Sequence, residues 1–409
     1  MADRVDALDF IRGFAVLGIL LANITAFAHN QMAYYWPPAL PGGASASDAW
    51  IWLAQFVIVD GKMRSLFAML FGAGLVLMAD RMAVRGGGEV GLQVRRLFWL
   101  ALFGIAHYLF LFSGDILFIY ALAGLVALFA LSFPTSNLLV GGALWSIAGS
   151  LFLMTSYGSV ALIEWQALEG SELPQVWPSV QDYWQERLAD SAAEAQIVAQ
   201  GTYADIVRHR VAEGPAELAS ALRIIFIETI PVILLGMGLY RAGLFTDAAF
   251  RAKWRGLAWL GVVVGAALLL ACGYGVMRQG FPIFLTQFVF FGVAPLLGLP
   301  LILGAILLLT DWAIAARDSW LGERLALAGR MAFTNYVGTS LVMMLIFEGW
   351  AGGLFGTMGR AELLLVVLFG WALMLTFSRV WLGTFRYGPL EWLWRCLTYG
   401  RLFPIRRAA

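Results

Sequence analysis

The stretch LDFIRGFAVLGILLANITAFA, residues 8–28, decides the fold of this chain. Asp9 and Arg12 stand three residues apart and therefore share one face of a helix. The apolar residues that follow continue this helix into a bilayer and hold one polar side chain, Asn23, at depth. An acid and an arginine at a membrane boundary are either an orienting anchor or part of a site. The stretch predicts a first transmembrane helix that is not cleaved.

The composition extends this interpretation to the whole chain. Of its 409 residues, 61% are hydrophobic and 13% are charged, whereas a soluble domain is about 45–50% apolar and about 25% charged. The apolar residues form runs of roughly 20, the length of a membrane-crossing helix, and not the short alternating segments of a barrel. We therefore expect an all-α polytopic membrane protein. A net charge of +1 gives no sign of nucleic-acid binding, and two cysteines give no sign of a disulfide framework or a metal site.

About ten transmembrane helices are predicted from the apolar runs. A further stretch at 49–60 is too short to cross alone, and it either lies in the interface or extends the second helix. Glycine pairs at 72/74 and 236/238 are expected to let helices pack closely. The predicted spans are 11–28, 65–80, 97–113, 116–133, 137–157, 222–240, 256–276, 283–309, 330–349 and 361–381.

The arginines set the expected orientation. When ten spans are threaded, the basic loops at 81–96, 241–255 and 311–330 and the basic tail all fall on one side. Positively charged loops stay in the cytoplasm, so both termini are predicted to be cytoplasmic.

A long acidic segment then lies outside. Residues 158–221 carry many more acids than arginines, and their pattern predicts amphipathic helices over the external face, either as a solvated cap or as a lid. The expected organisation is an N-terminal transmembrane half (1–157), this external helical loop (158–221) and a C-terminal transmembrane half (222–409).

Ionisable groups inside a bilayer are costly and are functional candidates by default. His107 is the histidine that falls inside a predicted span, and it can act as a general base near neutral pH. Asp115 follows eight residues later, beyond a break expected at Gly114, where it could orient the imidazole. We expect His107 to face a polar cavity together with Asn23 and Asp115. A structural histidine bonded to a backbone carbonyl is the alternative.

Three further groups of charges have both a structural and a functional interpretation. Glu228, near Pro231, is expected either to pair with Arg223 or Arg64 or to take part in function. The turn at 60–64, DGKMR, is expected to be an external, snorkelling anchor. The run YGPLEWLWR, residues 387–395, predicts a short amphipathic helix on the cytoplasmic surface, with Glu391 and Arg395 paired at i, i+4.

Five segments of the chain resemble the YeiB-like family of bacterial inner-membrane proteins, in which the C-terminal half is described as domain of unknown function 418. They are LDFIRGFAVLGILLANI (8–24), DGKMRSLFAMLFGAGL (60–75), GIAHYLFLFSGDILFIYALAGL (104–125), GRMAFTNYVGTSL (329–341) and YGPLEWLWRCLTY (387–399). The resemblance implies a location in the inner membrane.

The LDxxRG opening is also similar to that of membrane acyltransferases that modify cell-envelope sugars and of heparan-type lysosomal acetyltransferases. Asp9, Arg12 and Gly13 match the motif. The sugar-modifying family has a catalytic histidine eleven residues after the arginine, where this chain has Asn23, as the lysosomal-type branch does. That branch is the closer analogue.

This resemblance implies acyl transfer from cytoplasmic acyl-CoA to an envelope-side or lipid acceptor. His107 is then the expected base and Asn23 the oxyanion donor or orienter. Arg12, Arg330 and the arginines of loop 81–96 are expected to meet the CoA phosphates, with Asp9 and Asn335 in the same polar network. Membrane lipids are the expected surroundings, and a homodimer is left open. The alternative is a transporter or flippase of a small organic or lipid-linked molecule that uses Glu228 and His107 as coupling groups.

Overall fold

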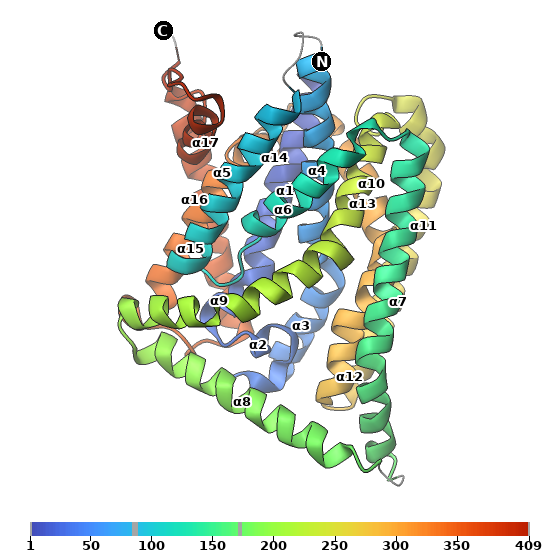
Figure 1. Cartoon of the computed structure of the whole chain (residues 1–409), viewed down its shortest axis with the longest axis vertical. Coiled ribbons are helices and arrows are strands. Elements are labelled where there is room, and N and C mark those ends of the chain that lie inside the picture. The colour runs from blue at the N-terminus through green and yellow to red at the C-terminus, as the bar shows by residue number, and fades with distance from the viewer. Residues whose placement is uncertain (1, 84–88, 171–173, 408–409) are drawn as a thin grey trace.

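The computed structural model describes residues 2–83, 89–170 and 174–407, and its helices carry the labels of Figure 1. No β-strand occurs in these ranges. The N-terminal helices are α1 (Ala2–Ala28), α2 (Met32–Tyr35), η1 (Pro37–Ala39), α3 (Ala46–Ile58), α4 (Lys62–Ala83), α5 (Glu89–Phe110), α6 (Leu117–Ala127), η2 (Leu128–Ser132), α7 (Thr135–Leu168), α8 (Trp177–Gln200) and α9 (Tyr203–Ile224). The C-terminal helices are η3 (Ile225–Thr229), α10 (Ile230–Arg241), α11 (Ala248–Arg278), α12 (Ile283–Gln287), η4 (Phe288–Val293), α13 (Ala294–Ala315), α14 (Trp320–Arg330), α15 (Ala332–Phe347), α16 (Arg360–Thr384) and α17 (Pro389–Tyr399).

The chain is an all-α, multi-pass membrane protein, as its composition predicts. Within the described ranges, seven helical runs are long and apolar enough to cross a membrane, and α14 with α15, bent by 83°, would make an eighth. This number is lower than the ten predicted. The apolar helix at Leu117–Ser132 is shorter than a full crossing, because Asp115 precedes it and Pro134 follows it. The stretch 49–60 extends the second helix, since Ala46–Ala83 forms one candidate span.

Several helices meet backbone to backbone at glycines. A Cβ on Gly72 of α4 would lie 2.2 Å from the Ile233 carbonyl oxygen of α10, and one on Gly236 would lie 2.1 Å from that of Met69. These two glycines therefore have the packing role predicted for them. A similar contact joins α1 to α14 at Gly13.

The segment after α7 is helical, as predicted. α8 lies across the end of the bundle opposite to α17, and α9 returns obliquely toward the bundle (Figure 1). Trp184 of α8 packs in a small apolar cluster with Met32 and Phe284. The expected boundaries at 157/158 and 221/222 fall inside α7 and α9, so the segment is continuous with the helices on either side of it.

Candidate functional site

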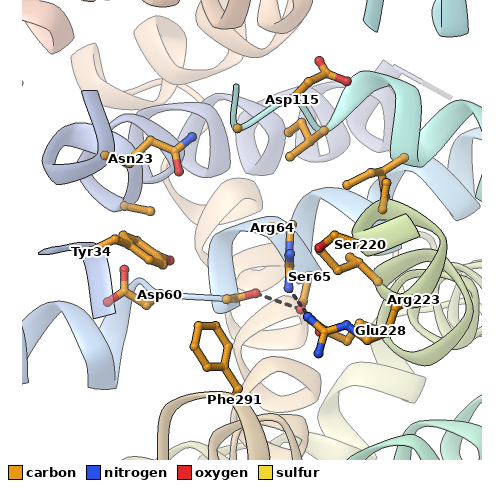
Figure 2. A pocket seen from close by; sticks show the side chains of 18 of the residues that line it. Asn23, Tyr34, Asp60, Arg64, Ser65, Asp115, Ser220, Arg223, Glu228 and Phe291 are labelled. Carbon is orange, nitrogen blue, oxygen red and sulfur yellow. Dashed lines mark hydrogen bonds and ion pairs between the residues drawn. The ribbon is translucent and has the colours of Figure 1, made fainter. Parts of the chain in front are cut away.

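A cavity of about 710 Å³ lies in the interior of the bundle (Figure 2). Most of its wall is apolar, and a small number of polar side chains from distant parts of the chain reach it. Such a combination is typical of small-molecule sites. The charged and amide side chains that line it are Asn23, Gln31, Asp60, Lys62, Arg64, Asp115, Glu217, Arg223 and Glu228.

The turn between α3 and α4 forms one side of this cavity, the Asp60 pole. Gly61 has a φ of 75°, a left-handed conformation that glycine adopts without strain, and the turn places Asp60 and Lys62 inward. Asp60 is 6% exposed and Lys62 is 3% exposed. The prediction that this turn is a snorkelling anchor is therefore wrong, because α13 covers the lysine, with Gly298 against its Cε.

Asp60 and Lys62 are held differently. The ammonium of Lys62 donates to the carbonyl oxygen of Phe56 and lies 5.0 Å from the centre of the Phe56 ring. Asp60 interacts with the hydroxyl of Tyr34, while its Oδ1 is buried without a hydrogen-bond partner. Burial raises the pKa of Tyr34 well above its ordinary value, and the charge of Asp60 adds to this rise. Tyr34 therefore stays protonated and can donate to the carboxylate.

The second pole is an ion pair between Arg64 of α4 and Glu228 of η3, one of the two partners that the sequence suggests for this glutamate (Figure 2). Tyr120 donates to the backbone oxygen of Arg64 at 2.7 Å and so fixes the start of α4. The side chains of the pair are 34% and 28% exposed, because they face the cavity. The charges of two candidate membrane-crossing runs thus pair with each other at the cavity, as ionisable groups in such helices usually do.

Two of the helical runs that line the cavity contain a π-helical segment there. η3 carries Glu228, and η4 brings Phe290 and Phe291 to the wall. Pro231 and Pro295 follow these segments closely, and proline removes a helical hydrogen bond. Single π-helical turns inside α-helices are frequent at functional sites. The sequence analysis noted Pro231 but did not predict either segment.

The three residues predicted to share a cavity are only partly brought together. Asn23 and Asp115 both line the cavity, whereas His107 is not among its lining residues. His107 is 2% exposed: Nδ1 donates to Asp115 Oδ1 at 2.9 Å, and Nε2 lies 2.9 Å from the Ser340 hydroxyl. Asp115 thus orients the imidazole as predicted and also accepts from the Phe118 N–H at 2.7 Å, which begins α6. Both ring nitrogens of His107 already have partners, so the expected free base is not exposed.

The predicted network of Asp9, Arg12 and Asn335 is also only partly formed. Arg12 donates to Asp9 at 2.8 Å, as predicted. Asn335 is buried, and its amide nitrogen donates instead to the Ala328 carbonyl and to the Ser378 hydroxyl, at 3.0 and 2.9 Å. The same carbonyl also accepts from the Met331 N–H at 3.1 Å, at the sharp bend between α14 and α15.

The C-terminal run forms the helix α17, but its predicted ion pair is not made. Glu391 accepts from the backbone N–H and the hydroxyl of Thr334, the former at 3.0 Å. Arg395 lies instead over the rings of Tyr387, Tyr399 and Phe403. The two side chains at i, i+4 do not pair with each other, because each contacts residues that the fold brings close. Arg330, the last residue of α14, is exposed and reaches the Arg386 carbonyl at 3.4 Å.

One buried residue that holds the site together is not apparent from the sequence. Arg360 is 2% exposed and donates to Gln55 of α3 and to the Ala33 carbonyl, both at 2.6 Å. Gln55 in turn donates to the Leu21 carbonyl of α1 at 2.8 Å. These bonds join α16, α3 and α1 beside the Asp60 pole. The partners are about 300 positions apart in sequence, so no local pattern indicates them. In the described residues no group of three or more His, Cys, Asp or Glu side chains could hold a metal ion.

Comparison with known proteins gives the family. The family described as "Protein of unknown function (DUF418)" matches residues 239–401. The chain is 30% identical to "Uncharacterized protein YeiB" of Escherichia coli (strain K12), over 97% of this chain and 96% of that protein. It is 28% identical to "Uncharacterized protein YxaH" of Bacillus subtilis (strain 168), over 99% of this chain and 96% of that protein. The chain therefore belongs to the YeiB-like family. No solved structure matches it significantly.

Proposed function

We propose that the protein is a membrane acyltransferase and that the acyl group is transferred in the cavity between the Asp60 and Arg64–Glu228 poles. The observation that carries this proposal is Asp60, whose side chain belongs to the cavity wall and whose Oδ1 is buried without a hydrogen-bond partner. A buried polar atom without a partner costs about 1–3 kcal/mol and calls for a ligand or a catalytic role.

The chemistry needs a base and a donor for the developing oxyanion. Asp60 takes the proton of the acceptor hydroxyl, and the acceptor oxygen attacks the thioester carbonyl of the acyl donor. The Asn23 amide stabilises the oxyanion of the tetrahedral intermediate. The C–S bond then breaks, CoA leaves as a thiolate, and the proton on Asp60 neutralises it. His107 acts through Asp115 as a positioning residue. Glu228, paired with Arg64, fixes the opposite wall.

Acyl-CoA is the proposed donor, and the end of the bundle that carries α17 is its proposed entry. Arg96 lies there over the Trp394 ring of α17, 4.4 Å from its centroid, and burial, with the charge of Arg12 second, lowers the pKa of Arg96. Two cations at this end favour the approach of an anion. Arg330, at the end of α14, adds an exposed cation at this end of the bundle. Asp9 and Asn335 are proposed to position the helices α1 and α15 there. The acceptor arrives from the opposite, envelope side, either as a lipid or as a soluble molecule.

The proposed location is the bacterial inner membrane, with both termini in the cytoplasm. α17 and the start of α1 lie at the same end of the bundle (Figure 1), and the basic loops support this side as the cytoplasmic one. A cysteine at Ala193, an exposed position of α8, in a chain whose Cys272 and Cys396 are replaced by serine, should react with an impermeant maleimide on intact cells. Reaction only after permeabilisation would reverse the orientation.

A transporter or flippase is the second candidate, and the π-helical segments η3 and η4 favour it. Interrupted helices with ionisable groups at the substrate site occur in many transporters. The two functions differ in one product. An acyltransferase releases free CoA, whereas a carrier moves its substrate across the bilayer without breaking a thioester.

The deciding experiment compares Asp60→Asn with Asp190→Asn, a matched change at an exposed carboxylate of α8. Purified protein in lipid nanodiscs receives radiolabelled acetyl-CoA and a bacterial lipid and envelope extract, and released CoA thiol and transferred label are measured. Loss of a general base lowers the rate by about 10²–10⁴-fold. We expect this loss for Asp60→Asn and no change for Asp190→Asn. No CoA release by the wild type, together with substrate flux in proteoliposomes, would replace the acyltransferase by the carrier.

A further inference from the structure

The rim of the cavity beside α9 has features that the proposed chemistry does not use. Leu218 and Arg223 of α9 both line the cavity and are exposed, Leu218 by 46%. Side chains that belong both to the wall and to the outer surface mark a place where the cavity opens. Figure 2 shows Arg223 beside Ser220 and Glu228 at this side of the cavity.

The surface beside this opening is apolar toward α7 and η3, while Glu217 of α9 also lines the cavity there. Leu222, Phe226 of η3 and Phe152 of α7 are 42%, 51% and 57% exposed. All three belong to runs that are long and apolar enough to cross a membrane. Exposed apolar side chains on such helices contact lipid chains, so the opening lies within the bilayer and not in the aqueous phase.

Arg223 brings a cation to this opening. Its Nη1 donates to the Tyr157 hydroxyl of α7 at 3.0 Å, and the Tyr157 ring stacks on Phe291 with centroids 5.6 Å apart. Among the residues that the structure describes, no carboxylate forms an ion pair with Arg223, because Glu228 is bound to Arg64. An unpaired guanidinium at this depth is costly, and its planar fork fits a phosphate.

A second polar group of the cavity wall, farther along α7, has no hydrogen-bond partner. Ser146 of α7 is 8% exposed, lines the cavity, and its hydroxyl is buried without a hydrogen bond. Because Ser146 precedes Tyr157 by 11 positions, about 16 Å along α7, it lies well away from Arg223. Arg223 is therefore the group that is placed to meet a phosphate at the opening.

We propose that Arg223 binds the phosphate of an anionic phospholipid that enters the cavity sideways beside α9, and that its headgroup is the acyl acceptor. The role of acceptor rests on the proposed function, whereas the binding of the lipid does not. The phosphate could also come from a free anion, and the apolar surroundings of the opening favour the lipid.

Lipid retention tests this proposal without any turnover. Detergent-purified protein is titrated with phosphatidylglycerol, with phosphatidylcholine of the same chains, or with inorganic phosphate, and bound molecules are counted by native mass spectrometry. Arg223→Gln keeps a hydrogen-bond donor for Tyr157 but removes the charge. Arg208→Gln is the matched control, since Arg208 lies on the same helix, has a 75% exposed side chain and pairs with Asp205.

The wild type should retain one phosphatidylglycerol about tenfold more tightly than phosphatidylcholine, and Arg223→Gln should lose about that factor. Arg208→Gln should behave as wild type, and Arg223→Lys, which keeps the charge, should retain most of the binding and show that the chain still folds. Equal retention by Arg223→Gln and wild type would overturn the proposal, and so would displacement of the lipid by millimolar phosphate. Lipid retention without CoA release would remove the proposed function and leave the lipid site. CoA release with unchanged retention in Arg223→Gln would remove only the lipid site.

Discussion

The helix contact around Asp9 and the cavity around Asp60 each place a carboxylate near a cation, and they are built in opposite ways. At the first, α1 and α14 touch through backbone atoms: a Cβ on Gly13 would lie 1.9 Å from the Leu325 carbonyl oxygen. At the second, broken helices stand apart around about 710 Å³ of space. Asp9 is bound to Arg12 of its own helix, whereas Asp60 keeps an oxygen without a partner.

The comparison teaches where a conspicuous motif acts. LDFIRG stands out in the sequence because it joins charge to a membrane helix, yet neither Asp9 nor Arg12 lines the cavity. Its glycine serves the contact with α14. The turn DGKMR looks like an ordinary helix end in the sequence, and it forms the polar wall of the site. The contact at Asp9 and the cavity at Asp60 differ in the space between their helices, and not in the number of charges in their sequences.

The largest expected effect concerns the tight contact. In Gly329→Ala the new Cβ would lie 1.7 Å from the Asp9 carbonyl oxygen, so α1 and α14 must move apart. Overpacking costs about 1–3 kcal/mol and occasionally more, and so close a contact places this variant at the upper end of that range. Thermal unfolding in detergent, followed by tryptophan fluorescence, should show a strongly lowered midpoint or too little protein to measure. Gly338→Ala of α15 is the control, because nothing lies within 4 Å of its Cβ and alanine favours a helix by about 1 kcal/mol. Equal midpoints for the two variants would show that the α1–α14 contact is loose.

The second prediction concerns the ion pair that faces the cavity. Arg64→Gln and Glu228→Gln each leave one charge of the pair without its partner, and each should lower the free energy of unfolding by about 1–2 kcal/mol, allowing for solvent in the cavity. The double variant should lose less than the sum, with a coupling of about 1 kcal/mol. The same cycle at Arg187 and Asp190, an exposed pair of α8 at 3.5 Å, should show a coupling near zero. Equal couplings would mean that the cavity holds bulk-like water and gives the pair no special environment.

Much of the fold follows from the sequence, and the site follows much less. Runs of about 20 apolar residues predict the helices because a bilayer demands them, and glycines such as Gly72 predict close contacts because few side chains fit there. The burial of Lys62 was not predictable, because it depends on α13, more than 200 residues away. The helical spacing of Glu391 and Arg395 was misleading, since Thr334 offers the carboxylate two donors, 57 residues away. Sequence patterns indicate which residues of one helix can interact with each other, whereas the site is formed by residues of different helices.

The smallest expected effect on turnover is at His107, and it separates the two possible bases. His107 binds Asp115 on one side and Ser340 on the other, so His107→Gln, which can replace one of these bonds, should cost about 1–3 kcal/mol of stability. The folded fraction should still turn over within about threefold of wild type, because Asp60 holds the base and Asp115 can keep its bond to the Phe118 N–H. The measurement is the rate of CoA release per folded molecule, counted by size-exclusion chromatography, beside that of Asp60→Asn. A His107→Gln protein that is folded but inactive, with Asp60→Asn active, would move the base to His107 and require the cavity to open toward α5 during the reaction. An active His107→Gln protein beside an inactive Asp60→Asn protein places the chemistry at the α3–α4 turn. There the helix breaks leave space, and Asp60 Oδ1 has no hydrogen-bond partner.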